Sequence, residues 1–385
     1  MATGRIPERA DVVVIGGGVM GTSVAFHLAE EGVDVLLLER DELAEGSTSR
    51  AAGGVRAQFS DPVNIALGLR SLEAFERFGT RPGAEIDLVQ SGYLFLLDDA
   101  EDVAAYEQSV PLQNEFGVPS RMLDVDEACR LCPLVSSEGL LAAVFSPRDG
   151  HCTPAAVVQG YAQGARAAGA TIARHCGVTD VDVAGDKIER VRTERGDVAT
   201  ETVVCAAGPW SAAVGEMVGV ELPIRPLRRQ IVVTEPVPDL PPDMPMTVDF
   251  GTSFYFHPEG RGLLIGMSDP DEQYGFDQSV SDGWLSRLGD AVARRAPRLA
   301  DVGLAHRWAG LYEVTPDHNA VVGEAESVSR FLYATGFSGH GFLQGPAIGE
   351  VLRDLVLGQP PVVDVSGLDC RRFASGATRA ERNII

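Results

Sequence analysis

Three glycines near the start of the chain have the spacing of a dinucleotide-binding turn. Gly16, Gly18 and Gly21 form a G-x-G-x-x-G pattern between an apolar run at 11–15 and a helical stretch. In such a turn the first glycine permits the sharp bend, the second lets the backbone approach a pyrophosphate, and the third lets the helix pack against the strand. Free N–H groups at the helix N-terminus favour phosphate. The pattern predicts a βαβ unit that binds a dinucleotide.

Glu39 supports this interpretation, because it ends a second apolar run over 33–38. A carboxylate at this place can accept hydrogen bonds from both hydroxyls of an adenosine ribose. A lone glycine pattern is weak support in a chain with 43 glycines, whereas strand, turn, helix, strand and acid in order are stronger. The alternative is an ordinary βαβ unit without a ligand. This region alone does not separate NAD from FAD.

Two further segments stand out by their small residues and glycines. The segment 46–56 is rich in small residues and ends in Arg56, so it suits close approach of the backbone to a flat ligand. A glycine loop far along the chain holds His340. The alternatives are that Arg56 is a surface arginine and that His340 is a hydrogen-bonded histidine of the core.

Several kinds of chemistry and partner are disfavoured by composition. Lys187 is the single lysine and is expected in a turn between two strands, which argues against Schiff-base chemistry. Cys129 and Cys132 form a lone C-x-x-C pair, so we expect structural, reduced thiols and no metal site. The net charge of -23 disfavours nucleic acid and anionic membranes. The apolar runs have strand length and the first residues are polar, so we expect no membrane span and a cytoplasmic location.

The elements needed to position these residues indicate an α/β protein with two domains. Helices are expected at 62–78, 99–132, 154–168, 281–295 and 346–357, with Pro346 at the first helical position. Strands are expected at 86–89 and 93–97, among others. A strand-rich, proline-rich stretch at 222–267 indicates an antiparallel second domain, and the end of the chain returns to α/β character. We expect a dinucleotide-binding domain at 1–85, 145–222 and 315–385, and a substrate domain at 86–144 and 223–314.

Over about residues 10–360 the chain resembles the FAD-dependent amine and amino-acid oxidoreductases of the D-amino-acid oxidase, glycine oxidase and sarcosine oxidase group. The resemblance is carried by the fingerprint from Gly16 to Glu39, the segment 46–56, the Ala-Ala-Gly-Pro-Trp turn at 206–210, the segment 312–317 and Gly-Phe-Ser-Gly-His-Gly-Phe at 336–342. The last motif is typical of the sarcosine-oxidase-like branch, close to the β subunits of heterotetrameric sarcosine oxidase and proline dehydrogenase. The resemblance implies a glutathione-reductase-like FAD-binding Rossmann domain and an antiparallel-sheet substrate domain.

The resemblance also implies roles for individual residues. Its substrate-side positions are His340, Arg56, Tyr312 and Tyr255. The residues expected to contact FAD are Gly16, Gly18, Val19, Met20, Gly21, Glu39, Arg40, Ser47, Thr48, Ser49, Ala52, Gly53, Gly54, Val178, Ala207, Gly208, Trp210, Gly310, Gly339, His340, Gly341, Phe342 and Leu343.

The sequence departs from this branch at positions that matter for chemistry. The position that often carries the flavin-attaching cysteine is Gly310, so we expect noncovalent FAD. Lysines that bind substrate and activate oxygen are replaced by Leu343 and Leu264, and Tyr312 stands where glycine oxidases place an arginine. The substrate therefore need not be sarcosine or glycine, and oxygen need not be the electron acceptor.

The resemblance and these residues together predict an FAD-dependent oxidoreductase. It would oxidise the C–N bond of a secondary or N-alkyl amino acid or amine by hydride transfer to the flavin, giving an imine that hydrolyses. The acceptor would be oxygen or an artificial or quinone oxidant. A dye- or quinone-linked dehydrogenase subunit of a hetero-oligomer is the first alternative, and a flavoprotein hydroxylase ranks below it. The substrate's identity, its stereochemistry and the oligomeric state stay open.

Overall fold

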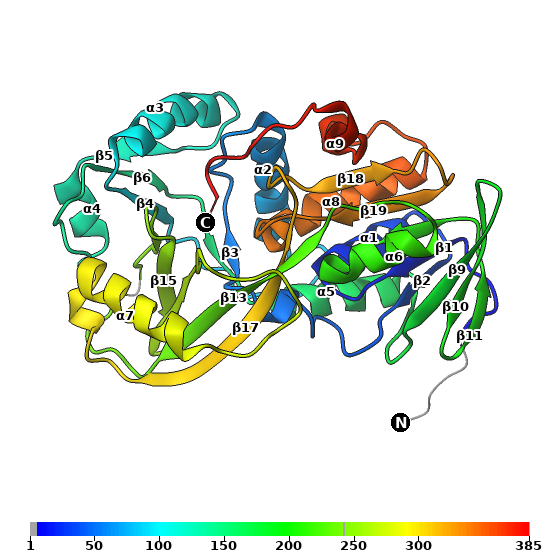
Figure 1. The fold of residues 1–385 in the computed structure, drawn as a ribbon, viewed down its shortest axis with the longest axis horizontal. Coiled ribbons are helices and arrows are strands. Elements are labelled where there is room, and N and C mark those ends of the chain that lie inside the picture. Colours follow the sequence, from blue (N-terminus) through cyan, green and yellow to red (C-terminus); the bar gives the residue numbers. More distant parts are fainter. Residues whose placement is uncertain (1–5, 242, 385) are drawn as a thin grey trace.

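The computed structural model describes residues 6–241 and 243–384, and a six-stranded sheet lies on one side of the molecule (Figure 1). Its order is β18-β19-β12-β1-β2-β8, parallel except for the edge strand β18. The strands are β1 (Val12–Ile15), β2 (Val35–Leu38), β8 (Thr171–Ala173), β12 (Val203–Cys205), β18 (Val321–Glu324) and β19 (Phe331–Thr335). Segments from widely separated parts of the sequence thus build one sheet.

Both faces of this sheet are covered, as continuous apolar strands require. Along β1, Val12 and Val14 belong to a core shared with helices, whereas Val13 and Ile15 face a second core. The helices of the first core are α1 (Val19–Glu30), α2 (Pro62–Glu76), α5 (Pro154–Ala167) and α8 (Gly341–Val356). The second core lies under α6 (Ser211–Met217) and a small antiparallel sheet of β9 (Val178–Ala184), β10 (Lys187–Thr193) and β11 (Gly196–Ala199).

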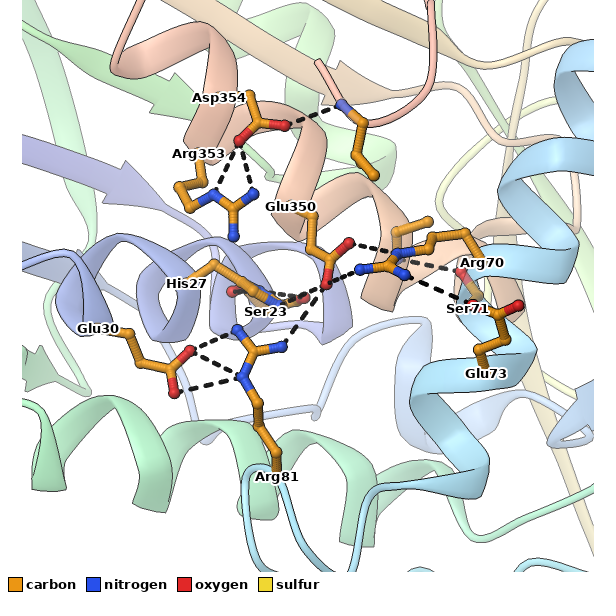
Figure 2. Close-up of polar contacts among 12 residues, drawn as sticks. Ser23, His27, Glu30, Arg70, Ser71, Glu73, Arg81, Glu350, Arg353 and Asp354 are labelled. Atoms are coloured by element: carbon orange, nitrogen blue, oxygen red, sulfur yellow. Dashed lines mark hydrogen bonds and ion pairs between the residues drawn. The ribbon is translucent and has the colours of Figure 1, made fainter. Parts of the chain in front are cut away.

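A buried carboxylate ties the first group of helices together (Figure 2). Glu350 on α8 is 5% exposed and accepts hydrogen bonds from Arg70 on α2, at 2.7 Å from Nε and 3.1 Å from Nη2. Arg81 Nη1 lies 3.6 Å and His27 Nε2 on α1 lies 3.8 Å from the same carboxylate. Burial lowers the pKa of His27 to about 4, so its ring is neutral near pH 7. Two arginines therefore compensate the charge of Glu350 between three helices.

An eight-stranded sheet forms the other side of the molecule, in the order β17-β13-β16-β15-β14-β4-β6-β5. Its neighbouring strands run antiparallel except for the pair β14 and β4. Helices α4 (Val125–Leu131) and α7 (Asp282–Arg295) pack on one face and α3 (Ala100–Glu115) on the other. The strands are β4 (Tyr93–Leu97), β5 (Arg121–Leu123), β6 (Ala142–Ser146), β13 (Arg225–Thr234), β14 (Met246–Asp249), β15 (Phe254–Glu259), β16 (Gly262–Met267) and β17 (Leu304–Val314).

Short elements connect and cover these sheets. Strands β3 (Gly54–Val55) and β7 (Gly150–His151) form an antiparallel pair of their own. The remaining helices are the single-turn segments η1 (Thr48–Arg50), η2 (Gly208–Trp210), η3 (Pro297–Leu299) and η4 (Ser366–Leu368), and α9 (Arg371–Ser375).

Three expectations about elements are wrong. Residues 86–89 are not a strand, because Asp87 has a φ of 53° that breaks an extended run. The helix expected over 99–132 is three elements, since Gly117 with φ 90° follows α3 and β5 then pairs with β6. The last long helix begins at Gly341, not at Pro346, and tolerates the proline at the cost of one early hydrogen bond. The other expected helices and strands 93–97 are present within a few residues.

Within the part of the chain that the structure describes, no helix is both long enough and apolar enough to cross a bilayer.

Candidate active site

A cavity of about 390 Å³ lies where the parallel sheet meets the eight-stranded sheet. Its walls come from the turn after β1, the segment after β2, the turn after β12, strands β13, β15 and β17, and the start of α8. The carboxyl ends of β1, β2 and β12 therefore open into it, which is the usual place for a ligand in an open parallel sheet.

The glycine turn at one end of the cavity has the geometry that its sequence predicts. Gly16 has a φ of 112°, and a Cβ there would lie 2.3 Å from the Ala206 carbonyl oxygen. A Cβ on Gly21 would lie 1.9 Å from the Gly16 oxygen, so this glycine permits close packing of α1. Glu39 accepts hydrogen bonds from the backbone N–H groups of Gly17 at 2.7 Å and Asp41 at 2.8 Å. These bonds hold the Glu39 carboxylate at the cavity wall.

Two helix N-termini open into the same cavity, and their N-cap residues supply no side-chain cap, although Thr48 Oγ1 accepts from the backbone N–H of Val19 on α1 at 3.2 Å. Gly18 is the N-cap of α1 and His340 is the N-cap of α8, and neither helix has a capping hydrogen bond from its N-cap side chain. Both N-caps and the residues after them line the cavity. Helix N-termini carry partial positive charge and unpaired N–H groups. The cavity therefore suits an extended ligand with negative charge at two separate places, as a dinucleotide with a redox-active ring has.

Three tyrosines line the other part of the cavity, and each lies over a glycine. A Cβ on Gly54 would lie 2.6 Å from the Tyr93 hydroxyl, and one on Gly339 would lie 2.6 Å from the Tyr312 ring. At Gly266 it would lie 2.2 Å from the hydroxyl of the third tyrosine, Tyr255. Burial raises the pKa of all three hydroxyls, so they stay protonated near pH 7.

Arg229 on β13 brings a cation without a carboxylate to these tyrosines. Its Cζ lies 4.9 Å from the centre of the Tyr312 ring, and its Nη1 donates to the backbone oxygen of Arg228 at 3.1 Å. Its Nε is buried and has no hydrogen-bond partner among the described residues. A buried donor without a partner costs about 1–3 kcal/mol, more when it is charged. An anionic ligand group would remove that cost.

Arg56 also lines the cavity, as the sequence predicts, but part of its bonding capacity is used within the protein. It is 2% exposed, donates to the backbone oxygen of Asn383 at 2.7 Å and to that of Gln58, and its Cζ lies 4.2 Å from the centre of the Phe59 ring. The interpretation as a surface arginine is therefore wrong. No carboxylate of the described chain forms an ion pair with it.

Burial shifts the pKa of two titratable groups of the cavity wall, His340 and Glu313, toward their neutral forms. Burial lowers the pKa of His340 well below its usual value, and the charges of Arg56 and His318 lower it further. The His340 ring is therefore neutral near pH 7. Burial raises the pKa of Glu313 to about 7 against hydrogen bonds from Thr335 and Phe337.

The structure brings together most of the residues predicted from the sequence. All of the expected FAD contacts line the cavity except Gly21, which packs α1 against the turn, and Ser49, which is exposed on η1. Arg56, Tyr255, Tyr312 and His340 also line it. Wall residues with reactive or charged groups that sequence reasoning missed include Tyr93, Arg229 and Glu313.

The structure also places the single lysine and the C-x-x-C cysteines. Lys187 begins β10 at an exposed hairpin and lies outside the cavity wall. Cys129 and Cys132 are free thiols, and burial raises the pKa of both. Among residues 6–241 and 243–384, no group of His, Cys, Asp and Glu could hold a metal ion.

The chain is similar to flavoproteins over nearly its whole length. Dimethylglycine dehydrogenase of Mus musculus is 30% identical over 96% of this chain and 45% of its own length, and sarcosine dehydrogenase of Homo sapiens is 30% identical over 98% and 43%. The chain thus spans less than half of these two relatives. The crystal structure of L-proline dehydrogenase from P. horikoshii matches with a TM-score of 0.91 and 31% identity, covering 97% of this chain and 100% of that one.

A family model described as FAD dependent oxidoreductase, DAO, matches residues 11–355. The match includes the glycine turn, the tyrosines of the cavity and the start of α8. The predicted fold class, the resemblance and FAD as cofactor are therefore confirmed. This chain belongs to the DAO family of FAD-dependent oxidoreductases.

Proposed function

We propose that this chain binds FAD noncovalently and oxidises the C–N bond of a secondary or N-alkyl amino acid. The observation that carries the proposal is the unpaired Arg229 beside the three cavity tyrosines, at the part of the cavity that α8 enters. A guanidinium binds a carboxylate in a bidentate manner. The amine-oxidising activities in the names of the relatives, on sarcosine, dimethylglycine and proline, support the same class of reaction.

The wall residues fit the parts of FAD in order. Glu39 would bind the adenosine ribose, and the start of α1 at Gly18 and Val19 would bind the pyrophosphate. The start of α8, from His340 to Leu343, would lie beside the flavin ring. When bound, FAD supplies the acceptor for a hydride from the substrate carbon next to nitrogen.

The residues of this chain prepare the amine for that loss of hydride. Arg229 would hold the substrate carboxylate, and the protonated hydroxyls of Tyr255 and Tyr312 would act as hydrogen-bonding groups rather than as bases. The positive charge of Arg229 and Arg56 disfavours an ammonium nearby, so it favours the free amine, whose lone pair is needed. The His340 ring stays neutral because its pKa is lowered, so it can accept a hydrogen bond at the nitrogen that carries no proton. Water would then hydrolyse the imine product.

Noncovalent attachment is supported at Gly310 on β17. This residue offers no atom for a thioether, and a Cβ there would lie 2.9 Å from the Cβ of Arg50. Precipitation of the holoenzyme with acid tests the proposal. We expect the flavin in the supernatant, and flavin that stays in the pellet would contradict noncovalent attachment.

The proposed reaction is tested by its products. Purified holoenzyme, a reducible dye and a panel of N-methyl and cyclic secondary amino acids should give dye reduction together with the aldehyde or imine-derived product in equal amounts. Dye reduction with none of these amines, in holoenzyme that carries one FAD per chain, would overturn the proposal.

A dehydrogenase subunit of a hetero-oligomer is the second candidate. The similarity to L-proline dehydrogenase supports it, and so does the position of the single lysine, Lys187, outside the cavity wall. Oxygen turnover well below dye-linked turnover would agree with a dehydrogenase, whereas equal rates would agree with an oxidase. A cytoplasmic location and any partner subunit stay predictions for fractionation and co-purification.

We further propose that the two sheets mark two domains with the boundaries expected from the sequence. The six-stranded sheet draws its strands from 1–85, 145–222 and 315–385, and β4, β5 and β13 to β17 come from 86–144 and 223–314. Strand β6 (Ala142–Ser146) joins the substrate sheet across the expected boundary at 144. Limited proteolysis that preserves either unit would support the division.

A further inference from the structure

Three guanidinium groups of the cavity wall, those of Arg50, Arg56 and Arg229, have no carboxylate partner among the described residues, and Arg56 and Arg229 lie near the rings of cavity tyrosines. Arg229 donates to the backbone oxygen of Arg228, and Arg56 donates to those of Gln58 and Asn383. A guanidinium has five N–H donors, so both keep donors for a ligand. Arg229 Nε is buried and unbonded.

Other arginines of the molecule show how this chain normally compensates such charges. Arg295, fully buried, pairs with Asp249 at 2.9 Å, and the buried Arg372 pairs with Asp317 at 2.8 Å. Arg228, the neighbour of Arg229 on β13, pairs with Glu272 and Asp277. The charge of Arg56 also acts on the buried carboxyl of Asp149, but burial raises the pKa of that carboxyl to about 7, so it compensates Arg56 only in part near pH 7. Because a buried charge without a full counter-charge is costly, Arg56 and Arg229 indicate a place for anions.

The acids of the cavity wall do not fill this role. Glu39 is bonded to backbone N–H groups at the glycine turn, and Asp41 lies 2.9 Å from Arg40. Glu45 accepts from the backbone N–H of Glu42 at 3.0 Å. Glu313 accepts from Thr335 Oγ1 at 3.0 Å.

Each of the two cations lies near the ring of a cavity tyrosine. Arg229 lies against the Tyr312 ring, and Arg56 Cζ lies 6.0 Å from the centre of the Tyr93 ring. The charges of Arg229 and Arg56 both oppose the rise that burial causes in the pKa of Tyr312. Both guanidinium groups line the same cavity as these tyrosines, so one small molecule bound there can meet both.

We propose that the substrate is an amino dicarboxylic acid with a substituted nitrogen, whose carboxylates bind Arg229 and Arg56. This inference rests on the proposed function and specifies its substrate class. A monocarboxylic amino acid would compensate one guanidinium and leave the other buried without an anion. Two carboxylates would compensate the charge of both guanidinium groups.

The experiment measures binding of simple diacids that cannot be oxidised. Malonate, succinate and glutarate are each compared with their monoamides, which keep the shape and lose one charge. Calorimetric titration of holoenzyme is carried out on the native chain, Arg229→Gln and Arg228→Gln. Arg228→Gln is the matched control, because Arg228 is the next residue on the strand and its partners lie outside the cavity.

We expect the best diacid to bind at least about 10-fold more tightly than its monoamide, as for a partly buried charge pair. Arg229→Gln should lose this preference, and Arg228→Gln should keep it. The inference is overturned if every diacid binds the native chain within about threefold of its monoamide, or if Arg229→Gln keeps the preference. Flavin content and circular dichroism of the two variants establish that both are folded.

A second measurement separates this inference from the proposed function. N-methylaspartate and N-methylasparagine are mixed anaerobically with holoenzyme, and reduction of the flavin is followed. If diacids bind more tightly than their monoamides but no amine reduces the flavin, the proposed oxidation is wrong and the site for two anions is retained. Reduction by monocarboxylic amines without a diacid preference would leave the oxidation and overturn the two-anion site.

Discussion

Glu313 shows at the level of one residue how burial sets the charge of the cavity wall. Burial raises its pKa from 4.5 to about 7. Between about pH 4.5 and about pH 7, the Glu313 carboxyl therefore keeps its proton in the folded protein and has lost it in the unfolded chain. The stability that neutral Glu313 contributes is fully present below about pH 4.5 and is lost as the pH rises through about 7.

Replacing this group should remove the corresponding pH dependence. We expect Glu313→Gln to gain about 2 kcal/mol of unfolding free energy relative to the native chain between about pH 5 and about pH 8. Urea unfolding of both proteins at the two pH values measures this difference. If the two proteins differ by the same unfolding free energy at both pH values, Glu313 is ionised in the folded protein over this whole pH range.

The position of the Tyr255 ring depends on the absence of a side chain at Gly266. A Cβ on Gly266 would lie 2.2 Å from the Tyr255 hydroxyl and 2.3 Å from Cζ, so the ring cannot keep its place beside an alanine. We expect Gly266→Ala to lower kcat/KM by about 10- to 100-fold while FAD stays bound, because small displacements in a site are costly.

Gly289 supplies the control for that substitution. It is exposed on α7, and a Cβ there would meet nothing within 4 Å. Gly289→Ala should therefore keep full activity and raise the unfolding free energy by about 0.5–1 kcal/mol. Full activity in Gly266→Ala would show that Tyr255 does not need its observed position.

Sequence reasoning found some site residues and missed others for physical reasons. Glu39 was predictable because a strand, a glycine turn and a helix fix its position relative to the ligand. Arg229 was not, since Arg228 and Arg229 are identical in type and only the pleat of β13 decides which one faces the cavity. Tyr93 stands in an apolar strand and gives no local sign of its role.

At the level of elements, α1, α2 and α8 depend on one another through Glu350 (Figure 2). The helices α1 and α8 bring their N-termini to the cavity, so their relative position sets the distance between its two ends. The Glu350 network lies between these helices and fixes how they pack. Its contribution should therefore appear in stability.

We expect Glu350→Gln to lower the unfolding free energy by about 1–2 kcal/mol, because Glu350 is buried while Arg70 and Arg81, 39% and 46% exposed, are partly screened by solvent. Glu73→Gln is the matched control. Glu73 is 37% exposed and lies 3.5 Å from the same Arg70, so its loss should cost less than about 0.5 kcal/mol. Equal losses in the two variants, measured by urea unfolding, would contradict this account of the network.

The boundaries of elements were harder to predict than their existence. Pro346 suggested a helix start, yet the helix begins at Gly341 and places residues 341–343 at its N-terminus. The N–H that a proline lacks falls in the second turn here, and packing of α8 against α1 and α2 outweighs one missing hydrogen bond. Such tertiary compensation leaves no trace in the local sequence.

At the level of the whole molecule, the cavity exists because two sheets from interleaved segments meet. The parallel sheet brings the glycine turn and Glu39, and the other sheet brings Arg229, Tyr255 and Tyr312. Residues of both sheets thus line one cavity, and the proposed place for an amino acid beside FAD depends on both.

Anaerobic mixing of the holoenzyme with amine substrates tests this account most directly. We expect the visible absorption of the oxidised flavin to disappear with at least one secondary or N-alkyl amino acid. The same amine should react at least about 100-fold more slowly with Arg229→Gln, as loss of a carboxylate anchor predicts. An unchanged flavin spectrum with every amine of the panel, or equal rates for Arg229→Gln and the native chain, would contradict the account.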